Sequence, residues 1–233
     1  LGLLIPVVII FICENMNTRV RGRKDLESVT VPFIGEIPLF TRNKKGIFRK
    51  KPQEVRAIVV KEGSRDIINE AFRVLRTNLE FMTGKDKASN VIIVTSFNPG
   101  SGKSFLTMNI AVSFAIKGKK VLVIDGDLRH GSASSYIDSP TKGLSDYLGG
   151  RIDNLNEIIV TNPKQKYLDI LPVGTIPPNP TELLFDDRLK QVIDTVREQY
   201  EYVLIDCPPI ELVADTQIIE KLADRTIFVV RAG

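Results

Sequence analysis

The sequence of 233 residues is 43% hydrophobic and 26% charged, which argues against a disordered chain and is typical of one α/β domain or two small ones. Its net charge of +4 arises in residues 1–62, which carry 12 Lys and Arg against 6 Asp and Glu, whereas residues 63–233 carry 20 against 22. The near-neutral second part argues against a nucleic-acid partner.

Residues 1–13 form an apolar run without a charge. The run is shorter than the about 20 residues that span a bilayer, so three interpretations compete: the C-terminal part of a transmembrane helix, a signal-peptide core, or a buried strand or helix. The basic residues follow the run instead of preceding it: Arg19, Arg21, Arg23 and Lys24. This order matches the positive-inside rule and favours the membrane helix, with its cytoplasmic end here.

Residues 14–62 are expected to form a juxtamembrane connector. It contains one short strand-like piece, residues 31–38, and a cationic stretch, residues 42–51. The stretch is either a solvated linker or a contact for anionic lipid, worth about 1 kcal/mol per basic residue near the surface, and the two interpretations are compatible.

A helix is predicted to begin at Ser64 and to end near Gly84. Its expected buried face consists of Ile67, Ile68, Ala71, Phe72, Leu75, Leu79 and Met82. The other face carries a charged stripe of Glu70, Arg73 and Arg76. Such stripes are usually only solvated, but one acid and two bases on neighbouring turns are self-complementary and also permit pairing with another subunit.

The most informative stretch is residues 96–104, which follow an apolar β-branched run and precede apolar residues at helical spacing. A strand, a glycine-bearing loop and a helix in this order bring backbone N–H groups and the helix dipole to one point, where a nucleotide phosphate is stabilised. The expected nucleotide-binding residues are Pro99, Gly100, Ser101, Gly102, Lys103, Ser104 and Phe105. In such a loop Lys103 reaches the β- and γ-phosphates and Ser104 binds Mg²⁺. The alternative is a Gly-Pro loop without a ligand.

The remainder of the chain alternates between strands and helices. The strands are expected at residues 121–124, 168–171, 202–205 and 226–230, with short helices and loops over 140–165. Gly118 is a predicted helix C-cap, and Asn179 with Pro180 is predicted to open a helix that runs towards Tyr200. Together these elements predict an α/β fold with a doubly wound, mostly parallel sheet.

Carboxylates follow two of these strands. Asp125 and Asp127 come after residues 121–124, and Asp206 comes after residues 202–205. Since ligands bind outside the carboxyl ends of such strands, the three side chains are expected beside Lys103 and Ser104, where they suit Mg²⁺ and leave one carboxylate to accept a proton. The alternative is that Asp125 and Asp206 only cap turns.

The remaining reactive side chains give weaker signals. His130, the single histidine, has no second ligand nearby and is interpreted as a loop residue. Cys207 has no neighbouring base and is interpreted as a small buried group. It is far from Cys13, so no disulfide is expected, in keeping with a reducing compartment.

With these motifs in place, residues 64–233 resemble the bacterial tyrosine kinases, the cytoplasmic kinase domains of membrane-bound polysaccharide copolymerases. Residues 96–104 resemble the Walker A motif of this family, residues 124–129 its Walker A′ motif and residues 204–206 its Walker B motif. Residues 177–184 and the spacing of Glu70, Arg73 and Arg76 look like further family motifs.

The resemblance implies a P-loop tyrosine kinase domain over 63–233, a connector over 14–62 and the end of a transmembrane helix over 1–13, on the cytoplasmic side of a bacterial inner membrane. It also implies ATP and Mg²⁺ as cofactors, with Ser104, Asp127 and Asp206 as metal ligands, Lys103 on the phosphates and Asp125 as the base; Asp125 and Asp127 could exchange roles. Glu70, Arg73 and Arg76 are implied to join subunits into a ring. The implied partners are the tyrosine-rich tail of a neighbouring subunit, a polysaccharide polymerisation and export machinery, and a phosphotyrosine phosphatase.

Two other functions fit the sequence. One is an ATPase switch of the ParA/MinD type, which shares the fold. That class places an extra lysine five residues before the P-loop lysine; this chain has Asn98 there, which favours the kinase. A glycine is also common one residue earlier, where Phe97 stands. The other alternative is a nucleotide-bound scaffold of a polysaccharide export complex.

Overall fold

The computed structural model describes residues 20, 22–26, 29–39, 57–83, 91–210 and 214–232. The apolar run at 1–13, the cationic stretch at 42–51 and Gly84 lie outside the described residues. The chain divides into two compact units. The smaller unit contains a short 3₁₀ helix, η1 (Arg23–Leu26), and the larger unit comprises Ile34–Val229.

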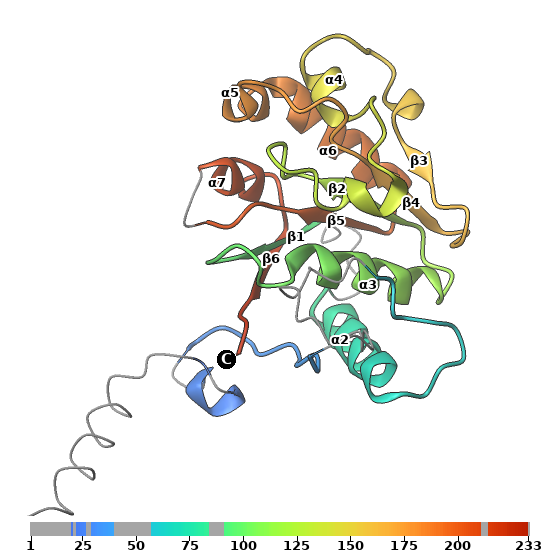
Figure 1. Ribbon diagram of the computed structural model, residues 1–233, viewed down its shortest axis with the longest axis vertical. Coiled ribbons are helices and arrows are strands. Elements are labelled where there is room, and N and C mark those ends of the chain that lie inside the picture. Colours follow the sequence, from blue (N-terminus) through green and yellow to red (C-terminus); the bar gives the residue numbers. More distant parts are fainter. Residues whose placement is uncertain are drawn as a thin grey trace, which may run out of the picture. The chain divides into compact units, whose positions relative to one another are not determined.

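The larger unit is built on a six-stranded sheet with the order β3-β4-β2-β5-β1-β6 (Figure 1). Its strands are β1 (Val91–Ser96), β2 (Val121–Asp125), β3 (Val160–Thr161), β4 (Leu168–Leu171), β5 (Tyr202–Asp206) and β6 (Arg225–Val229). All neighbouring strands pair in parallel except β3 with β4. The central strands β1, β2 and β5 are buried along their whole length, which is why they appear in the sequence as continuous apolar runs.

Helices cover both faces of this sheet (Figure 1). On one face α2 (Ile67–Thr83) and α3 (Lys103–Ala115) share a hydrophobic core with the strands. On the other face a second core contains α4 (Leu144–Leu148), α5 (Pro180–Leu184), α6 (Asp187–Gln199) and α7 (Asp215–Glu220). Two 3₁₀ helices, η2 (Ser134–Ile137) and η3 (Leu155–Glu157), lie between these elements in the chain. The predicted doubly wound α/β fold is confirmed.

Helix α2 differs from its prediction in its first residue and in which of its residues face the core. It begins at Ile67, because the Asp66 carboxylate accepts a hydrogen bond from the Asn69 amide (2.9 Å) and so caps the first turn. Ile67 is 79% exposed and Met82 is 36% exposed, so the assignment of both to the buried face was wrong. Arg76 was predicted on the charged face but is only 6% exposed, because it shares a face with Phe72 and Leu79 at helical spacing.

Two other segments also differ from their predictions. No strand forms over residues 31–38; instead Ile34 and Ile37 pack against the core, and the Asn78 side chain donates to the Ile34 carbonyl (2.8 Å). The helix expected from Pro180 to Tyr200 is two helices, since the Asp186 carboxylate accepts from the Arg188 amide (2.8 Å) and starts α6 anew.

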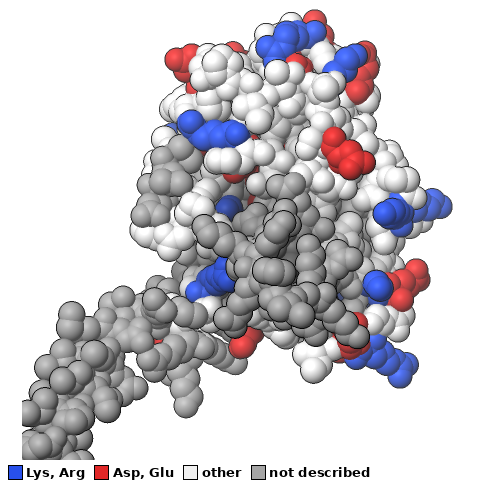
Figure 2. Space-filling model, viewed as in Figure 1, with Lys and Arg blue, Asp and Glu red and all other residues white. Residues whose placement is uncertain are grey.

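Two surface properties of the described residues bear on the predicted partners. None of the helices that the structure describes has both the length and the apolar content needed to cross a membrane. On the face drawn in Figure 2, basic and acidic side chains are interspersed and no patch of a single sign stands out among the described residues.

Gly174→Ala is expected to destabilise the fold far more than Gly118→Ala. Both glycines have a positive φ, 79° and 77°, so both variants incur the left-handed strain of roughly 1–2 kcal/mol. A Cβ at Gly174 would in addition lie 2.3 Å from Asp146 Oδ2 and 2.4 Å from the Gly143 amide nitrogen, whereas nothing lies within 4 Å of one at Gly118. Urea unfolding should show a loss of about 3 kcal/mol or more for Gly174→Ala; equal losses in both variants would contradict this packing.

Candidate active site

The loop between β1 and α3 has the backbone geometry of an anion cradle. Gly100 (φ 71°) and Gly102 (φ 93°) adopt left-handed conformations that favour glycine. Gly102 is the N-cap of α3 and offers no side-chain acceptor, and the space beside its Cα is open. The N–H groups of the first turn of α3, which begins at Lys103, therefore suit a phosphate at the positive end of the helix dipole.

Short polar contacts fix the shape of this loop. The hydroxyls of Ser96 and Ser101 both donate to the Asn98 carbonyl, at 2.8 and 2.7 Å. Phe97, which occupies the position of a common glycine, is 52% exposed and does not interrupt the loop. The predicted strand, loop and helix around residues 96–104 are thus present.

Asp125 and Asp206 meet at the carboxyl edge of the sheet. They are the last residues of β2 and β5 and are direct partners in the parallel register, which places their Cα atoms about 4.8 Å apart. Two residues later, the Asp127 amide donates weakly to Asp125 Oδ1 (3.3 Å). The sequence correctly predicted that the three carboxylates gather where the P-loop lies.

The Asp206 carboxylate is buried, and neither of its oxygens receives a hydrogen bond of normal geometry. The residue is only 1% exposed. Burial raises its pKa well above the ordinary value and the negative charge of Asp125 adds to this shift, while the nearby Ser104 hydroxyl and Lys103 ammonium oppose it. A buried carboxylate in this condition costs free energy unless a cation neutralises it. Asp206 therefore fits a metal ion that arrives with a nucleotide.

The wider donor set also suits Mg²⁺. Within the described residues, no three His, Cys, Asp or Glu side chains form a group that would hold a metal by itself. Mg²⁺ commonly takes one or two carboxylates and completes its shell with phosphates and water, so Asp206, Asp127 and the Ser104 hydroxyl fit it as an ion shared with a nucleotide.

The Asp125 carboxylate is held from one side. Its Oδ2 accepts hydrogen bonds from the Ser134 amide (2.6 Å) and the Ser134 hydroxyl (2.7 Å), while Oδ1 has only the long contact to the Asp127 amide. Complete burial raises the pKa of Asp125 to about 7, although the bonds from Ser134 oppose the rise. A carboxylate with a pKa near neutrality suits a general base.

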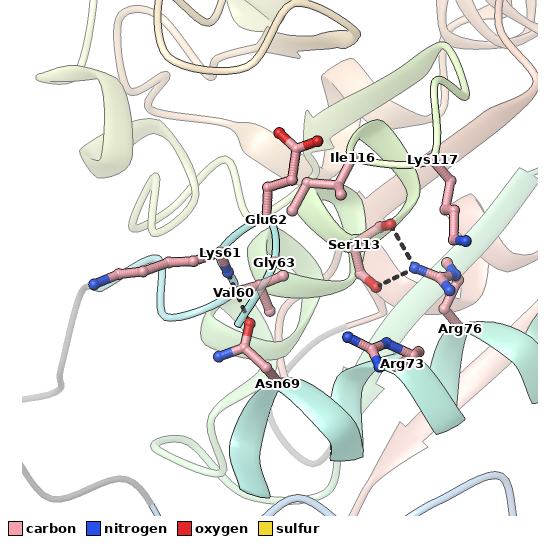
Figure 3. A pocket seen from close by; sticks show the side chains of 10 residues that line it. All are labelled: Val60, Lys61, Glu62, Gly63, Asn69, Arg73, Arg76, Ser113, Ile116 and Lys117. Carbon is pink, nitrogen blue, oxygen red and sulfur yellow. Dashed lines mark hydrogen bonds between the residues drawn. The ribbon is translucent and has the colours of Figure 1, made fainter. Parts of the chain in front are cut away.

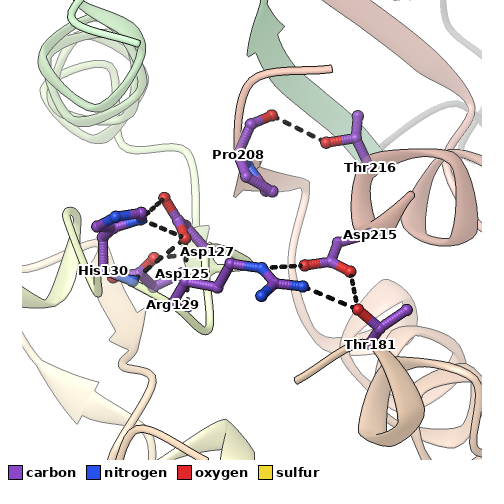
Figure 4. Close-up of polar contacts among 8 residues, drawn as sticks. All are labelled: Asp125, Asp127, Arg129, His130, Thr181, Pro208, Asp215 and Thr216. Atoms are coloured by element: carbon purple, nitrogen blue, oxygen red, sulfur yellow. Dashed lines mark hydrogen bonds and ion pairs between the residues drawn. The ribbon is translucent and has the colours of Figure 1, made fainter. Parts of the chain in front are cut away.

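The Asp127 carboxylate organises the loop that follows β2. Its Oδ1 accepts from the amides of Arg129 and His130 (3.2 Å each), and His130 Nδ1 lies 3.2 Å away (Figure 4). The His130 side chain is 70% exposed. His130 is a loop residue as predicted, but its contact with Asp127 was not predicted.

A second polar cluster joins this loop to α5 and α7 (Figure 4). Arg129 Nε donates to Asp215 Oδ2 (3.0 Å), and its terminal nitrogen donates to the Thr181 hydroxyl (2.9 Å), which in turn donates to Asp215 Oδ1 (2.6 Å). Asp215 is 1% exposed. No pattern in the sequence indicated this cluster, whose members are 34 to 86 residues apart.

The three predicted interface residues of α2 lie in two different environments. Glu70 and Arg73 are half-exposed and pair with each other at 2.7 Å on the surface of α2. Arg76 is buried instead, and its terminal nitrogen donates to the carbonyl and hydroxyl of Ser113 at 3.0 and 3.2 Å (Figure 3). Cys207 is fully buried, as predicted, and burial raises the pKa of its thiol well above the ordinary value.

Comparison with known proteins identifies the family of this chain. Residues 89–232 match the family described as AAA domain. The chain is 31% identical to a putative tyrosine-protein kinase in the cps region of Klebsiella pneumoniae, over 99% of this chain and 32% of that protein. It is 36% identical to the tyrosine-protein kinase YwqD of Bacillus subtilis, over 76% of this chain and 74% of that protein.

The chain belongs to the bacterial tyrosine kinases. Among solved structures, the kinase domain of the Escherichia coli tyrosine kinase ETK is similar with a TM-score of 0.78 and 29% identity, over 91% of this kinase chain and 82% of the other. MinD from Pyrococcus horikoshii, complexed with Mg-ADP, is similar with a TM-score of 0.53 and 28% identity, over 60% and 57%. This tyrosine kinase chain spans about a third of the length of the Klebsiella and E. coli relatives, 32% and 33%.

Proposed function

We propose that this chain transfers the γ-phosphoryl group of ATP to tyrosine side chains of proteins. The observation that carries the proposal is the buried, unpartnered carboxylate of Asp206, in register with Asp125 at the sheet edge that the P-loop adjoins. Phosphoryl transfer requires positioning and charge neutralisation at such an edge. Membership of the bacterial tyrosine kinases adds the acceptor, a tyrosine.

The residues at this edge of the sheet have different roles in the proposed reaction. The N–H groups of residues 100–105 and the Lys103 ammonium bind the phosphates, and Pro99 shapes the loop that leads into them. Ser104, Asp127 and Asp206 hold Mg²⁺, which when bound neutralises charge on the phosphates. Mg-ADP in the MinD structure supports this assignment.

Asp125 prepares the acceptor. We propose that Asp125 Oδ1 accepts the proton of the attacking tyrosine hydroxyl, because Ser134 donates two hydrogen bonds to Oδ2 and leaves Oδ1 with one long contact. The ordinary pKa of a phenol is near 10, so the carboxylate is effective only when it lies close to the hydroxyl and is ionised. A pKa of about 7 keeps a large ionised fraction at neutral pH.

We further propose that the kinase acts in trans within a ring of subunits that contact one another through α2. The exposed face of α2 carries Glu70 and Arg73 and, at intervals of seven residues, the exposed apolar side chains of Ile67, Val74 and Phe81. Exposed apolar side chains beside charges are typical of protein contacts. Buried Arg76 is not available to a neighbouring subunit and would support the helix from inside.

The cellular setting is also a proposal. We infer that residues 1–13 end a transmembrane helix, residues 14–62 connect it to the kinase domain at 63–233, and the kinase faces the cytoplasm of a bacterium. The Klebsiella relative is named for a cps region, and relatives from Erwinia and Ralstonia are called AmsA and EpsB. We propose that the kinase takes part in polysaccharide polymerisation and export in this setting, and that a phosphotyrosine phosphatase removes the phosphate from its tyrosines.

The decisive experiment is incubation of the full-length protein with Mg·ATP, followed by detection of phosphotyrosine. Wild type should label itself, whereas Lys103→Met should show at least a hundredfold less labelling, because it lacks the charge that neutralises the phosphates. Absence of phosphotyrosine in wild type would refute the kinase proposal.

The likeness to MinD keeps an ATPase switch as the second candidate. Steady release of inorganic phosphate without labelled tyrosine would favour that function. A Lys103→Met variant that still supports polymer of normal length in cells would instead favour a nucleotide-bound scaffold.

A further inference from the structure

The first two residues of α7 are bonded to both segments that carry the proposed metal ligands. Asp215 accepts a hydrogen bond from Arg129 Nε (3.0 Å), in the loop after β2. The Thr216 hydroxyl donates to the Pro208 carbonyl (2.9 Å), in the segment after β5. The start of α7 therefore connects the loop after β2 to the segment after β5 (Figure 4).

Arg129 extends this connection to Asp127. Its amide donates to Asp127 Oδ1 (3.2 Å), while its guanidinium donates to Asp215 and to the Thr181 hydroxyl. In the described part of the chain, Asp127 Oδ2 has one contact, to His130 Nδ1 at 3.3 Å. Oδ1 is thus held by the backbone of its own loop, and Oδ2 is the oxygen better placed to bind a cation.

The segment that follows Asp206 is fixed by the same helix. The Pro208 carbonyl accepts from the hydroxyls of Thr95 (2.8 Å) and Thr216 (2.9 Å). Both threonines are 2% exposed, so water does not compete for these bonds. Because Pro208 follows Asp206 by only two residues, the bonds restrain the end of β5, where Asp206 lies.

The Arg129 cluster, which consists of Arg129, Thr181 and Asp215, is better explained by positioning than by stability. Asp215 is 1% exposed, and its two oxygens accept from Arg129 and from the Thr181 hydroxyl (2.6 Å). A buried ion pair gives little net stability, because the lost hydration offsets the attraction between the charges. A guanidinium that bonds two partners at once fixes direction as well as distance, so it suits a loop that must be held in one place.

We propose that the Arg129 cluster sets the distance between Asp127 and Asp206, and thereby the affinity of the nucleotide-loaded site for a divalent cation. The cluster acts through Asp127, since its own carboxylate is buried and already paired. Groups that orient metal ligands typically change metal affinity about 10- to 100-fold when they are lost. The inference rests on the proposed metal-binding roles of Asp127 and Asp206.

Electron paramagnetic resonance of Mn²⁺ tests this proposal on the full-length protein with bound ADP. Mn²⁺ prefers the same oxygen ligands as Mg²⁺, and its spectrum distinguishes bound from free ion. Thr181→Val removes only the hydroxyl and should weaken Mn²⁺ binding about threefold, and Arg129→Met should weaken it about tenfold. Arg129→Lys keeps the charge without the paired hydrogen bonds and should recover part of that loss. The affinity for ADP without a divalent ion should stay unchanged, because the P-loop is intact.

Arg197→Lys is the matched control. Arg197 also bonds a carboxylate and a carbonyl, those of Asp224 and Leu222. Asp224 accepts from the amide of Val91, the first residue of β1, so this pair lies at the opposite edge of the sheet. Arg197→Lys should therefore bind Mn²⁺ as tightly as wild type does.

The proposal is wrong if Thr181→Val and Arg129→Met bind Mn²⁺ as wild type does, or if Arg197→Lys weakens binding as much as Arg129→Lys. It is also wrong if Arg129→Met loses ADP affinity by the same factor without a divalent ion. If Arg129→Met fails to fold, Thr181→Val and Arg129→Lys decide the question. A wild-type protein whose Mn²⁺ affinity is not raised by ADP would refute the proposed metal site as well, whereas unchanged variants would refute only the role of the Arg129 cluster.

Discussion

Asp206→Asn should make the nucleotide-free protein more stable and at the same time abolish tyrosine phosphorylation. The stabilisation arises because the wild-type carboxylate is buried with both oxygens unpartnered and next to Asp125. Asparagine removes the charge and keeps the volume. We expect a gain of about 2 kcal/mol at pH 8, or about 4–8 °C in melting temperature for a domain of this size.

The sign of the pH dependence follows from the raised pKa of Asp206. A carboxyl group whose folded pKa lies above its unfolded value stabilises the protein below the unfolded pKa of 3.8, and this contribution is lost as the pH rises. The stability difference between Asp206→Asn and wild type should therefore grow from about pH 4 upwards. Thermal unfolding between pH 4 and pH 8 measures it.

The loss of activity has a separate cause. The amide that replaces the carboxylate in Asp206→Asn carries no charge to hold Mg²⁺ beside the phosphates, so phosphotyrosine formation should fall by at least a hundredfold. Asp194→Asn, on the exposed side of α6, is the control and should change neither property. An Asp206→Asn protein that melts at the wild-type temperature, or that still labels tyrosine, would contradict the assignment.

The framework of the site was predictable because it depends on local sequence. Strands buried on both faces are continuous apolar runs, and parallel pairing brings their carboxyl ends to one edge. Asp125 and Asp206 follow such runs directly, so the sequence placed both at this edge, although not their direct pairing, which depends on β2 lying beside β5. The glycines at 100 and 102 likewise indicated the left-handed backbone conformations that open the loop towards a phosphate.

The parts that escaped prediction depend on contacts between distant segments. Ser134 bonds to Asp125 across nine residues, and Arg129 reaches Asp215 across 86, and neither pair has a characteristic spacing. Arg76 was misplaced because the alternation of charges on α2 suggested an exposed stripe, whereas its guanidinium is buried against Ser113 of α3. No periodicity in α2 reveals an acceptor on another helix.

The break between α5 and α6 has a different explanation. Apolar residues continue through Leu183, Leu184 and Leu189, so the segment is compatible with one helix. The chain instead takes an extended conformation at Asp186, whose carboxylate caps the second helix. Competing local hydrogen bonds of this kind favour helix ends at aspartate, but sequence alone does not decide between the cap and the continuous helix.

Asp125→Asn is expected to reduce tyrosine phosphorylation by about 10²- to 10⁴-fold and to leave nucleotide binding close to wild type. An amide does not accept the proton of the attacking hydroxyl, whereas the P-loop and Asp206 remain in place. Titration with a fluorescent ADP analogue and a phosphotyrosine assay on the same preparation separate the two effects. Equal losses of nucleotide affinity and of phosphorylation would assign Asp125 to nucleotide binding instead of proton transfer.

Ser134→Ala provides a graded form of the same test. The Ser134 hydroxyl donates to Asp125 Oδ2 and so holds the pKa of Asp125 below the value that burial alone would give. Without this bond the pKa rises, and a base that must be ionised then works only at higher pH. The acidic limb of the phosphorylation rate should move up by about one pH unit, equivalent to a hydrogen bond of about 1.4 kcal/mol.

Ser135→Ala is the matched control, because the Ser135 hydroxyl donates to the Ser132 carbonyl and does not contact Asp125. The Ser134 hydroxyl also accepts from the Val173 amide (2.8 Å), so Ser134→Ala should cost about 1–3 kcal/mol of stability as well. A loss of stability alone lowers the rate at every pH and leaves the limb where it was. If Asp125 is the base, the acidic limb of the pH–rate profile shifts to higher pH in Ser134→Ala and keeps its wild-type position in Ser135→Ala.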